Sequence, residues 1–347
     1  MFSPRPIKKG RKNRVGNGRI CSRSRVFKLK SQLNGEIAGT GAILADFIGI
    51  ASSIWSLCYG WLMQDAPFTL FEPIQRSSCV VFAAPHSGRH YAPEFLAQSV
   101  LDSHEIRASE DAFVDQLFAP AIEFGAPLLV ANAPRAYVDL NRACDELDPA
   151  VIEGVKSLGV NARIASGLGV VPRVVAIGTP IYRGKISRAA AQERIDRIWW
   201  PYHHQLSALL DQTRAQFGQA ILIDCHSMPH SAVDRGPLEG SAPQIVLGDR
   251  FGAAADEVLM SQIHGAFVEA GFRVARNTPF AGAFISRRYG KPQMGQHAVQ
   301  IEIDRSLYMD EARIQPNAEF NDFRRRLAGV IAQIARLGQS GQELAAQ

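Results

Sequence analysis

Four residues of the sequence have side chains that could perform chemistry together, namely His86, Asp224, His226 and Glu302. Each follows or lies within a short apolar segment of the kind that forms a buried strand. Catalytic zinc is bound by histidine and carboxylate side chains that leave one position open for water, and a glutamate outside this set can act as general base. Spacing alone does not separate a metal ligand from a hydrogen-bonded core histidine, because most of these positions are far apart in the chain.

Two apolar segments lead directly into the histidines. Residues 221–223 are branched and apolar, which predicts a strand buried on both faces, and a proline ends this strand after His226. Side chains alternate along a strand, so Asp224 and His226 point to the same side. Residues 78–85 predict a second buried strand, which ends at His86. Ligands of α/β proteins bind at the carboxyl ends of such strands, so we expect a site there.

The segment 299–304 has the clearest alternation in the sequence. Its apolar and polar side chains face opposite ways: Val299, Ile301 and Ile303 on one side, and Gln300, Glu302 and Asp304 on the other. A carboxylate on a central strand is costly unless it is paired or has a function. The pattern therefore indicates a role for Glu302.

Two further carboxylates lie between these strands in the sequence. Ser109 is a good helix N-cap, and Glu110 and Asp111 would occupy the first turn, where the helix dipole favours acidic residues. This capping role is one interpretation of the two acids. Their nearness to His86 in the sequence is the argument for a function in the site.

Composition limits the class of protein. The 347 residues contain 46% apolar and 20% charged residues, as in an ordinary globular protein, and five cysteines without a CxxC pair. An odd number of unpaired cysteines indicates a reducing compartment rather than a disulfide framework. The net charge of +5 comes from residues 1–40, which have 11 Lys or Arg against Glu36, so the rest of the chain sums to −5. A mildly acidic body is not typical of a nucleic-acid-binding protein.

Residues 1–62 form a basic extension, which we expect to be disordered over residues 1–34. Residues 41–63 are mostly apolar and long enough for a membrane anchor. Any contact with a membrane is expected only through these residues. Met63 opens a segment typical of the start of a cytoplasmic enzyme. The extension is therefore interpreted as an over-long translation start, a membrane anchor or a regulatory segment.

Six sequence blocks, in order, closely resemble those of the N-formylglutamate amidohydrolase family. The similarity extends from about residue 71 to about residue 337. The blocks are Pro85-His86-Ser87-Gly88, Ser109-Glu110-Asp111 with Val114-Asp115, Tyr137-Val138-Asp139-Leu140-Asn141-Arg142, the segment 179–185, Asp224-Cys225-His226-Ser227 and the segment 300–309.

The resemblance implies a fold and a domain arrangement. The family is similar in fold to zinc carboxypeptidases, so we expect an α/β protein of the phosphorylase/hydrolase-like class, a three-layer α/β/α sandwich around a mixed sheet. Residues 63–347 would form one catalytic domain. Residues 143–170 contain Gly, Asp and Pro, which predicts a surface loop that could lie around the site.

The resemblance also implies a metal site. His86 and His226 would bind a divalent metal, with zinc expected, and Glu302 would be the general base. Carboxypeptidases have a glutamate three residues after their first histidine, whereas this chain has Arg89 there. We therefore predict Asp111 as the third ligand, with Glu110 as the alternative.

The substrate implied by the family is N-formyl-L-glutamate, which has two carboxylates. Arginine binds carboxylates bidentately, and the Asn141-Arg142 pair resembles the carboxypeptidase segment that holds a substrate carboxylate. Arg142 is the first candidate, Arg183 and Arg135 follow, and a structural salt bridge is the alternative for each. Arg305 is expected to pair with Asp304 or Glu302.

The implied reaction is hydrolysis of N-formyl-L-glutamate to formate and L-glutamate in the cytoplasm, a step of histidine degradation. One alternative is a metallohydrolase that acts on another N-acyl amino acid or a carboxyl-terminal peptide. A second is an inactive metal-binding or scaffold protein. A serine hydrolase is disfavoured because neither Ser87 nor Ser227 lies in a Gly-x-Ser-x-Gly elbow. The sequence leaves the oligomeric state open.

Overall fold

The computed structural model of the chain describes residues 66–156, 161–234 and 242–337. The expectations for residues 1–62, including those for the apolar segment 41–63, fall outside these ranges. Within them, no helix combines the length and the apolar character needed to cross a membrane.

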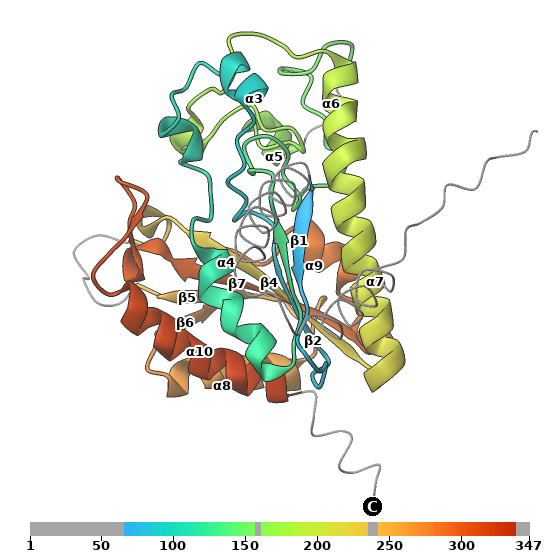
Figure 1. Cartoon of the computed structure of the whole chain (residues 1–347), viewed down its shortest axis with the longest axis vertical. Coiled ribbons are helices and arrows are strands. Elements are labelled where there is room, and N and C mark those ends of the chain that lie inside the picture. The colour runs from blue at the N-terminus through green and yellow to red at the C-terminus, as the bar shows by residue number, and fades with distance from the viewer. Residues whose placement is uncertain (1–65, 157–160, 235–241, 338–347) are drawn as a thin grey trace, which may run out of the picture. The chain divides into compact units, whose positions relative to one another are not determined.

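Seven strands of the described chain form one mixed sheet in the order β1-β3-β2-β4-β7-β5-β6 (Figure 1). Their bounds are β1 Phe68–Phe71, β2 Val80–Ala84, β3 Leu128–Ala131, β4 Ala220–Met228, β5 Ile245–Gly248, β6 Val274–Arg276 and β7 Gln296–Asp304. Strands β3, β2, β4 and β7 are parallel, whereas β1 is antiparallel to β3 and β5 is antiparallel to β7. The carboxyl ends of the central parallel strands therefore meet at one edge of the sheet.

Helices cover both faces of this sheet. Their bounds are α3 Pro93–Gln98, α4 Val114–Phe118, α5 Ala162–Ala165, α6 Arg188–Arg194, α7 Trp200–Phe217, α8 Glu257–Glu269, α9 Phe284–Tyr289 and α10 Phe320–Arg336. Two short strands, β8 Met309–Asp310 and β9 Gln315–Pro316, pair with each other outside the main sheet. Side chains of α4, α8 and α10 share one core with the sheet, and side chains of α6, α7 and α9 share the other. The predicted three-layer α/β/α sandwich around a mixed sheet is confirmed.

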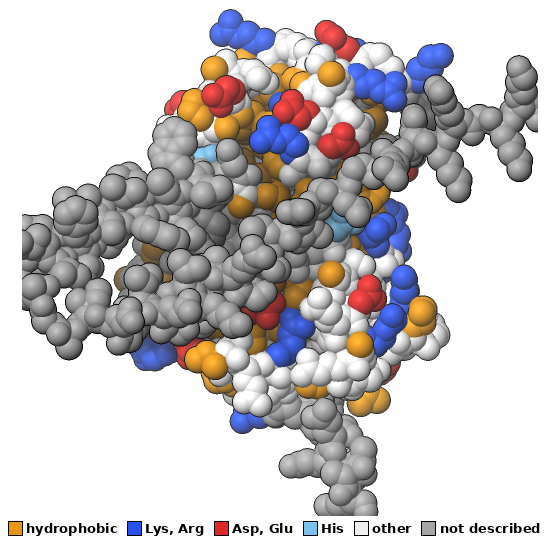
Figure 2. All heavy atoms as spheres, turned by 45° about the vertical axis from the view of Figure 1, so that its right-hand side comes forward, with side chains coloured by type: hydrophobic (Ala, Val, Ile, Leu, Met, Phe, Trp, Pro, Cys, Tyr) orange, Lys and Arg blue, Asp and Glu red, His pale blue; other side chains and the backbone are white. Residues whose placement is uncertain are grey.

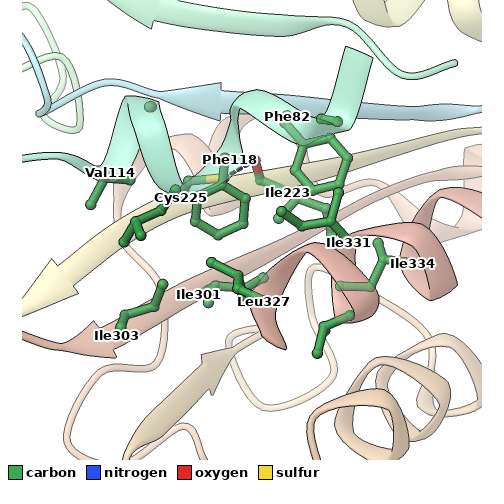
Figure 3. Close-up of a cluster of buried hydrophobic side chains, with 14 of the residues drawn as sticks. Phe82, Val114, Phe118, Ile223, Cys225, Ile301, Ile303, Leu327, Ile331 and Ile334 are labelled. Carbon is green, nitrogen blue, oxygen red and sulfur yellow. Dashed lines mark hydrogen bonds between the residues drawn. The ribbon is translucent and has the colours of Figure 1, made fainter. Parts of the chain in front are cut away.

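Strands β4 and β7 divide their side chains between the two layers. Ile223 and Ile301 point into the core beneath α4 and α10, where Figure 3 shows them beside Phe118 and Leu327. All nine residues of each strand are buried, so the polar side chains on the opposite side are also removed from bulk water. The alternation predicted for β7 is confirmed.

The helical segment before β4 contains a widened turn. Ser187 caps α6 by accepting a hydrogen bond from the backbone N–H of Ala190, and a π-helical turn over Ile195–Trp199 connects α6 to α7. Pro201 follows this turn, and its missing backbone N–H explains the local change in hydrogen bonding. The break expected at Pro201 is wrong, because α6, the π-helical turn and α7 follow one another without interruption and Pro201 lies in the first turn of α7.

The cap expected at Ser109 is wrong. Helix α4 begins only at Val114, after Phe113 in a left-handed backbone conformation with φ of 66°. The preceding segment is held against the end of β2 instead, because the backbone N–H of Asp111 donates to the carbonyl of His86 over 3.0 Å. Asp111 therefore lies at the sheet edge and outside the first turn of a helix.

On the face shown in Figure 2, positive and negative side chains of the described residues are interspersed around apolar ones. No segregation of charge is visible on the uncovered part of this face. Charged side chains also line a cavity at the sheet edge.

Candidate active site

The strand register brings the predicted residues together. Ala83 of β2 pairs with Asp224 of β4, and His226 of β4 pairs with Glu302 of β7. His86 continues β2 by two residues and so reaches the level of His226. The two imidazole ring centroids are 4.7 Å apart.

His86, Asp111 and His226 present a possible ligand set for a metal ion. One ligand atom from each residue lies within 4.8 Å of the others, and all three residues are buried. Asp111 Oδ2 is 3.0 Å from His226 Nδ1 and 3.5 Å from His86 Nδ1. Both histidines therefore present Nδ1 to the same carboxylate oxygen.

A second carboxylate lies beside the other nitrogen of each histidine. His86 Nε2 hydrogen-bonds Asp139 Oδ1 over 2.7 Å, and His226 Nε2 lies 3.0 Å from Asp224 Oδ1. The Asp139 carboxylate favours the proton of His86 on Nε2 and leaves its Nδ1 free to bind a metal. His226 Nε2 also lies 3.0 Å from Asn141 Nδ2. His86 Nδ1 is buried without a hydrogen-bond partner among the described residues, and coordination of a metal ion would satisfy it. These residues fit a divalent cation.

The charges of the site favour a cation between these residues. Burial acts to raise the pKa of Asp111, but its interactions with His226 and His86 outweigh burial and hold the pKa well below its usual value. Burial likewise acts to lower the pKa of His226, but Asp224 and Asp111 outweigh it and raise the pKa. The same anionic surroundings would stabilise either a proton or a metal ion.

Arg305 and Ser227 orient the Asp111 carboxylate. Asp111 Oδ1 accepts hydrogen bonds from Arg305 Nη2 over 3.0 Å and from Ser227 Oγ over 3.2 Å. This fixes Oδ1 and turns Oδ2 towards the histidines. The expected pairing of Arg305 with Asp304 or Glu302 is wrong, since Asp304 pairs with His230 and Arg305 reaches Asp111 instead.

Glu302 lies in the same cavity with only 7% of its surface exposed. Gln300 Nε2 donates to its Oε1 over 2.7 Å. The pKa of Glu302 is raised to about 7. Burial is the largest cause, Asp111 and Asp224 also raise the pKa, and His226 and Arg135 offset part of the effect. A carboxyl group with this pKa can exchange a proton near neutral pH.

The alternative third ligand, Glu110, is engaged elsewhere. Arg107 donates to both of its carboxylate oxygens, over 2.9 and 3.1 Å, and Tyr91 Oη donates to Oε2 over 3.3 Å. Arg89, at the position where carboxypeptidases have glutamate, forms an ion pair of 3.2 Å with Asp115. Of the two predicted alternatives, Asp111 therefore lies in the possible ligand group and Glu110 does not.

The cavity has a volume of about 780 Å³ and contains the possible ligand group, Glu302 and several arginines. Arg142 lines it, is 5% exposed, and donates from Nε to the Leu168 carbonyl and from Nη1 to the Asn141 carbonyl. Among the described residues no carboxylate lies within ion-pair distance of Arg142. This arginine can therefore accept an external carboxylate.

Residues 78–309 match the family model of N-formylglutamate amidohydrolase. The chain belongs to this family. The N-formylglutamate deformylases of Pseudomonas putida and Pseudomonas aeruginosa are each 30% identical to it over 239 residues, which cover 67% of this chain and 82% of theirs.

Solved structures agree with the family assignment. The N-formylglutamate amidohydrolase of Ralstonia eutropha JMP134 is 34% identical, with a TM-score of 0.74 over 80% of this chain and 99% of that one. A gene product of Agrobacterium tumefaciens, 16% identical, has a TM-score of 0.57 over 81% of this chain and 98% of that one. The second similarity concerns the fold alone.

The other substrate-binding residues predicted from the sequence differ in their positions. Asn141 is buried, and its amide is used internally, since Oδ1 accepts from the backbone N–H of Ile285 and Nδ2 donates to Asp224. Arg135 lines the cavity while its Nε donates to Asp139 over 3.1 Å. Arg183 is exposed and is not among the residues that line the cavity, so its position does not support the predicted role.

Two residues of the site were missed from the sequence. Asp139 stands in the Tyr137–Arg142 block, and the carboxylate–histidine pairing expected around a metal could have singled it out. Arg163 lines the cavity from α5, within the segment expected to be a loop around the site. No motif or periodicity marks Arg163, because only the fold brings it there.

Proposed function

We propose that this chain hydrolyses N-formyl-L-glutamate to formate and L-glutamate, with Glu302 as general base beside a metal held by His86, Asp111 and His226. The observation that carries the proposal is the joint position of these four residues in one cavity that arginines also line. The names of the Pseudomonas and Ralstonia relatives support the substrate. The reaction would serve histidine degradation in the cytoplasm.

The ligand set favours zinc. Two histidine nitrogens and one carboxylate oxygen are a donor set typical of catalytic zinc sites, and His86, Asp111 and His226 would hold the ion. When bound there, the ion supplies a water of lowered pKa and an electrophile for the formyl carbonyl oxygen. Asp139 and Asp224 would keep the two histidine rings in position, and Asp139 would hold the proton of His86 on Nε2.

Glu302 performs the proton transfers in this proposal. It accepts a proton from the attacking water as the new C–O bond forms at the formyl carbon. It then delivers this proton to the amide nitrogen as the C–N bond breaks, which releases formate and the amino group of glutamate. Its pKa of about 7 suits both transfers at neutral pH.

Two arginines act on the charges of substrate and intermediate. Arg135 keeps its positive charge, because Asp139, Asp111 and Glu302 raise its pKa against the effect of burial. It lines the cavity and is our candidate for stabilising the negative charge that develops on the carbonyl oxygen. Arg142 has no described carboxylate partner and is our candidate for binding a substrate carboxylate.

The catalytic unit proposed is residues 63–347. The described residues of this range contain every group used above, and the family model lies wholly within it. The full-length chain and a chain that begins at Met63 should therefore have equal specific activity, which a comparison of the two purified proteins would measure.

The function is tested by formate release from N-formyl-L-glutamate by the purified full-length protein. Release should stop when a chelator removes the metal and return when zinc is added. N-acetyl-L-glutamate, measured in parallel, separates a deformylase from a hydrolase of other N-acyl amino acids. A folded, zinc-loaded protein that releases acetate but no formate would contradict the proposed substrate.

A further inference from the structure

A second cavity adjoins the reaction cavity and has a volume of about 280 Å³. It contains none of the possible metal ligands and does not include Glu302. The two cavities share the following lining residues: Asn141, Arg142, Arg163, Gly282 and Ala283. A substrate bound at the metal group could therefore extend past Arg142 into this second cavity.

The lining of the second cavity is strongly positive. Its arginines are Arg142, Arg163, Arg250 and Arg287, and we call this group the arginine pocket. Glu146 is its only acidic lining residue. Such an excess of guanidinium groups in a small cavity is suited to a carboxylate, which arginine can bind with two parallel hydrogen bonds.

The one acid offsets little of this charge. Glu146 Oε1 is 3.8 Å from Arg287 Nη2 and also accepts from the backbone N–H of Ala143 over 3.1 Å. Its Oε2 accepts from Asn161 Nδ2 over 3.5 Å. Among the described residues, neither Arg163 nor Arg250 has a carboxylate within ion-pair distance. The pocket therefore keeps unpaired positive charge.

Burial makes this charge costly at the junction of the two cavities. Burial lowers the pKa of Arg142, and the nearby Arg135 and Arg163 lower it as well, while Asp139 and Glu146 oppose them. A bound carboxylate would relieve the repulsion between these guanidinium groups.

The backbone at Arg250 adopts an unfavourable conformation that neighbouring hydrogen bonds hold in place. Arg250 and Phe251 both have φ of 57°, in the left-handed region that side chains with a Cβ rarely adopt. The backbone N–H of Arg250 donates to the Ala281 carbonyl over 2.7 Å, and that of Phe251 donates to Asn277 Oδ1 over 3.2 Å. Such conformations persist where surrounding contacts fix them, often beside a binding site.

We propose that the arginine pocket binds the side-chain carboxylate of the substrate and so selects acyl derivatives of dicarboxylic amino acids. This inference rests on the proposed function. Arg142, at the junction, takes the carboxylate nearer to the scissile amide. Arg163, Arg250 and Arg287 take the more remote one.

The test compares kcat/KM for N-formyl-L-glutamate and N-formyl-L-glutamine, which have nearly the same shape but differ in side-chain charge. Wild-type protein should prefer the glutamate derivative. Arg163→Gln and Arg250→Gln should each lower kcat/KM for that derivative by about tenfold to a hundredfold, mainly through KM. Turnover of the glutamine derivative should change by less than about threefold, because it makes no charged contact with these arginines.

Arg287→Gln and Arg288→Gln form a matched pair within α9. Both arginines are exposed, but only Arg287 lines the arginine pocket. Arg287→Gln should reduce the preference for the glutamate derivative, and Arg288→Gln should leave it unchanged. The proposal is overturned if wild-type protein does not distinguish the two substrates, or if the variants lose activity on both equally.

A failure of the proposed function is distinguishable from a failure of this inference. If wild-type protein releases formate from neither substrate, calorimetric titration with L-glutamate and L-glutamine still measures the pocket. Binding of glutamate that is tighter than that of glutamine, and weakened by Arg163→Gln and Arg250→Gln, would support the pocket. Equal binding of the two would overturn it.

Discussion

The two sides of strands β4 and β7 have opposite chemistry. On one side Ile223 and Ile301 pack into a core with α4 and α10 (Figure 3). On the other side, His226 and Glu302 lie against a charged cavity at the sheet edge. Burying the second set costs free energy, and the apolar set on the same strands offsets this cost. The comparison predicts that substitutions of the apolar set change mainly stability, whereas substitutions of the charged set change mainly the chemistry.

Replacing the proposed base should have the largest effect on activity. Glu302→Gln keeps the shape of the side chain but cannot accept a proton, so kcat should fall by about 10²–10⁴-fold. Formate-release kinetics measure this, with zinc content as the control for an intact metal site. Activity close to wild type would remove Glu302 from the role of base.

The same substitution should also change how the free energy of unfolding depends on pH. The pKa of Glu302 is raised to about 7 in the folded protein, so its ionised form is disfavoured by folding. In metal-free wild-type protein, stability should therefore fall as the pH rises from the unfolded-state pKa through about 7, by on the order of 3 kcal/mol. Glu302→Gln should remove this part of the pH dependence, which urea unfolding compared between about pH 4.5 and about pH 8 would detect.

A core substitution should have the converse effect. Ile301→Ala leaves a cavity beside Ile223 and Leu327, which should lower the free energy of unfolding by about 2–5 kcal/mol. The kcat of the remaining folded protein should stay close to wild type, because Ile301 points into the core and away from the reaction cavity at the sheet edge. A large fall in kcat without a fall in stability would mean that the two sides are not separable.

Loss of a carboxylate behind a histidine should have an intermediate effect. Asp139→Asn removes the charge that holds the His86 ring, so zinc affinity should fall by about 10–100-fold. Competition with a chromogenic chelator measures this affinity. Asp148→Asn offers a control, because Asp148 pairs with Arg173 and lies outside the ligand group. Equal effects of the two substitutions would count against a specific role for Asp139.

The smallest expected effect is that of pH on wild-type activity. Glu302 must be ionised to accept a proton, so kcat/KM should fall by about tenfold per pH unit below the pKa of this carboxyl group. The metal-bound protein should have this limb below the metal-free pKa of about 7, because the positive charge of the ion favours the carboxylate. An acid limb that persists in Glu302→Gln would belong to another group.

Much of the scaffold could be predicted from the sequence because strands have a simple period. Alternation along residues 299–304 assigned Glu302 to one side and Ile301 to the other, and strand ends located His86 and His226. These are local signals, since each depends on a few neighbouring residues. The family resemblance extended them to the layered fold.

The remainder of the site depends on contacts between distant segments. The local pattern places Asp111 in the first turn of a capped helix, and only the family resemblance indicates it as the third ligand. In the structure a hydrogen bond to the end of β2 holds it beside the histidines. Arg305 pairs with Asp111, 194 residues away in the chain. Arg163 and Arg250 come to one pocket from separate segments, and no local period encodes such convergence.

The most direct test of the central claim is a zinc titration of the metal-free full-length protein, followed by metal analysis and formate release. We predict one zinc ion per chain for wild type and for Glu302→Gln, with activity only in the former. Asp111→Asn and His226→Ala should lose both tight zinc binding and activity. Full formate release by zinc-free protein, or unchanged zinc binding in the two ligand variants, would contradict the assignment of His86, Asp111 and His226 as the metal site.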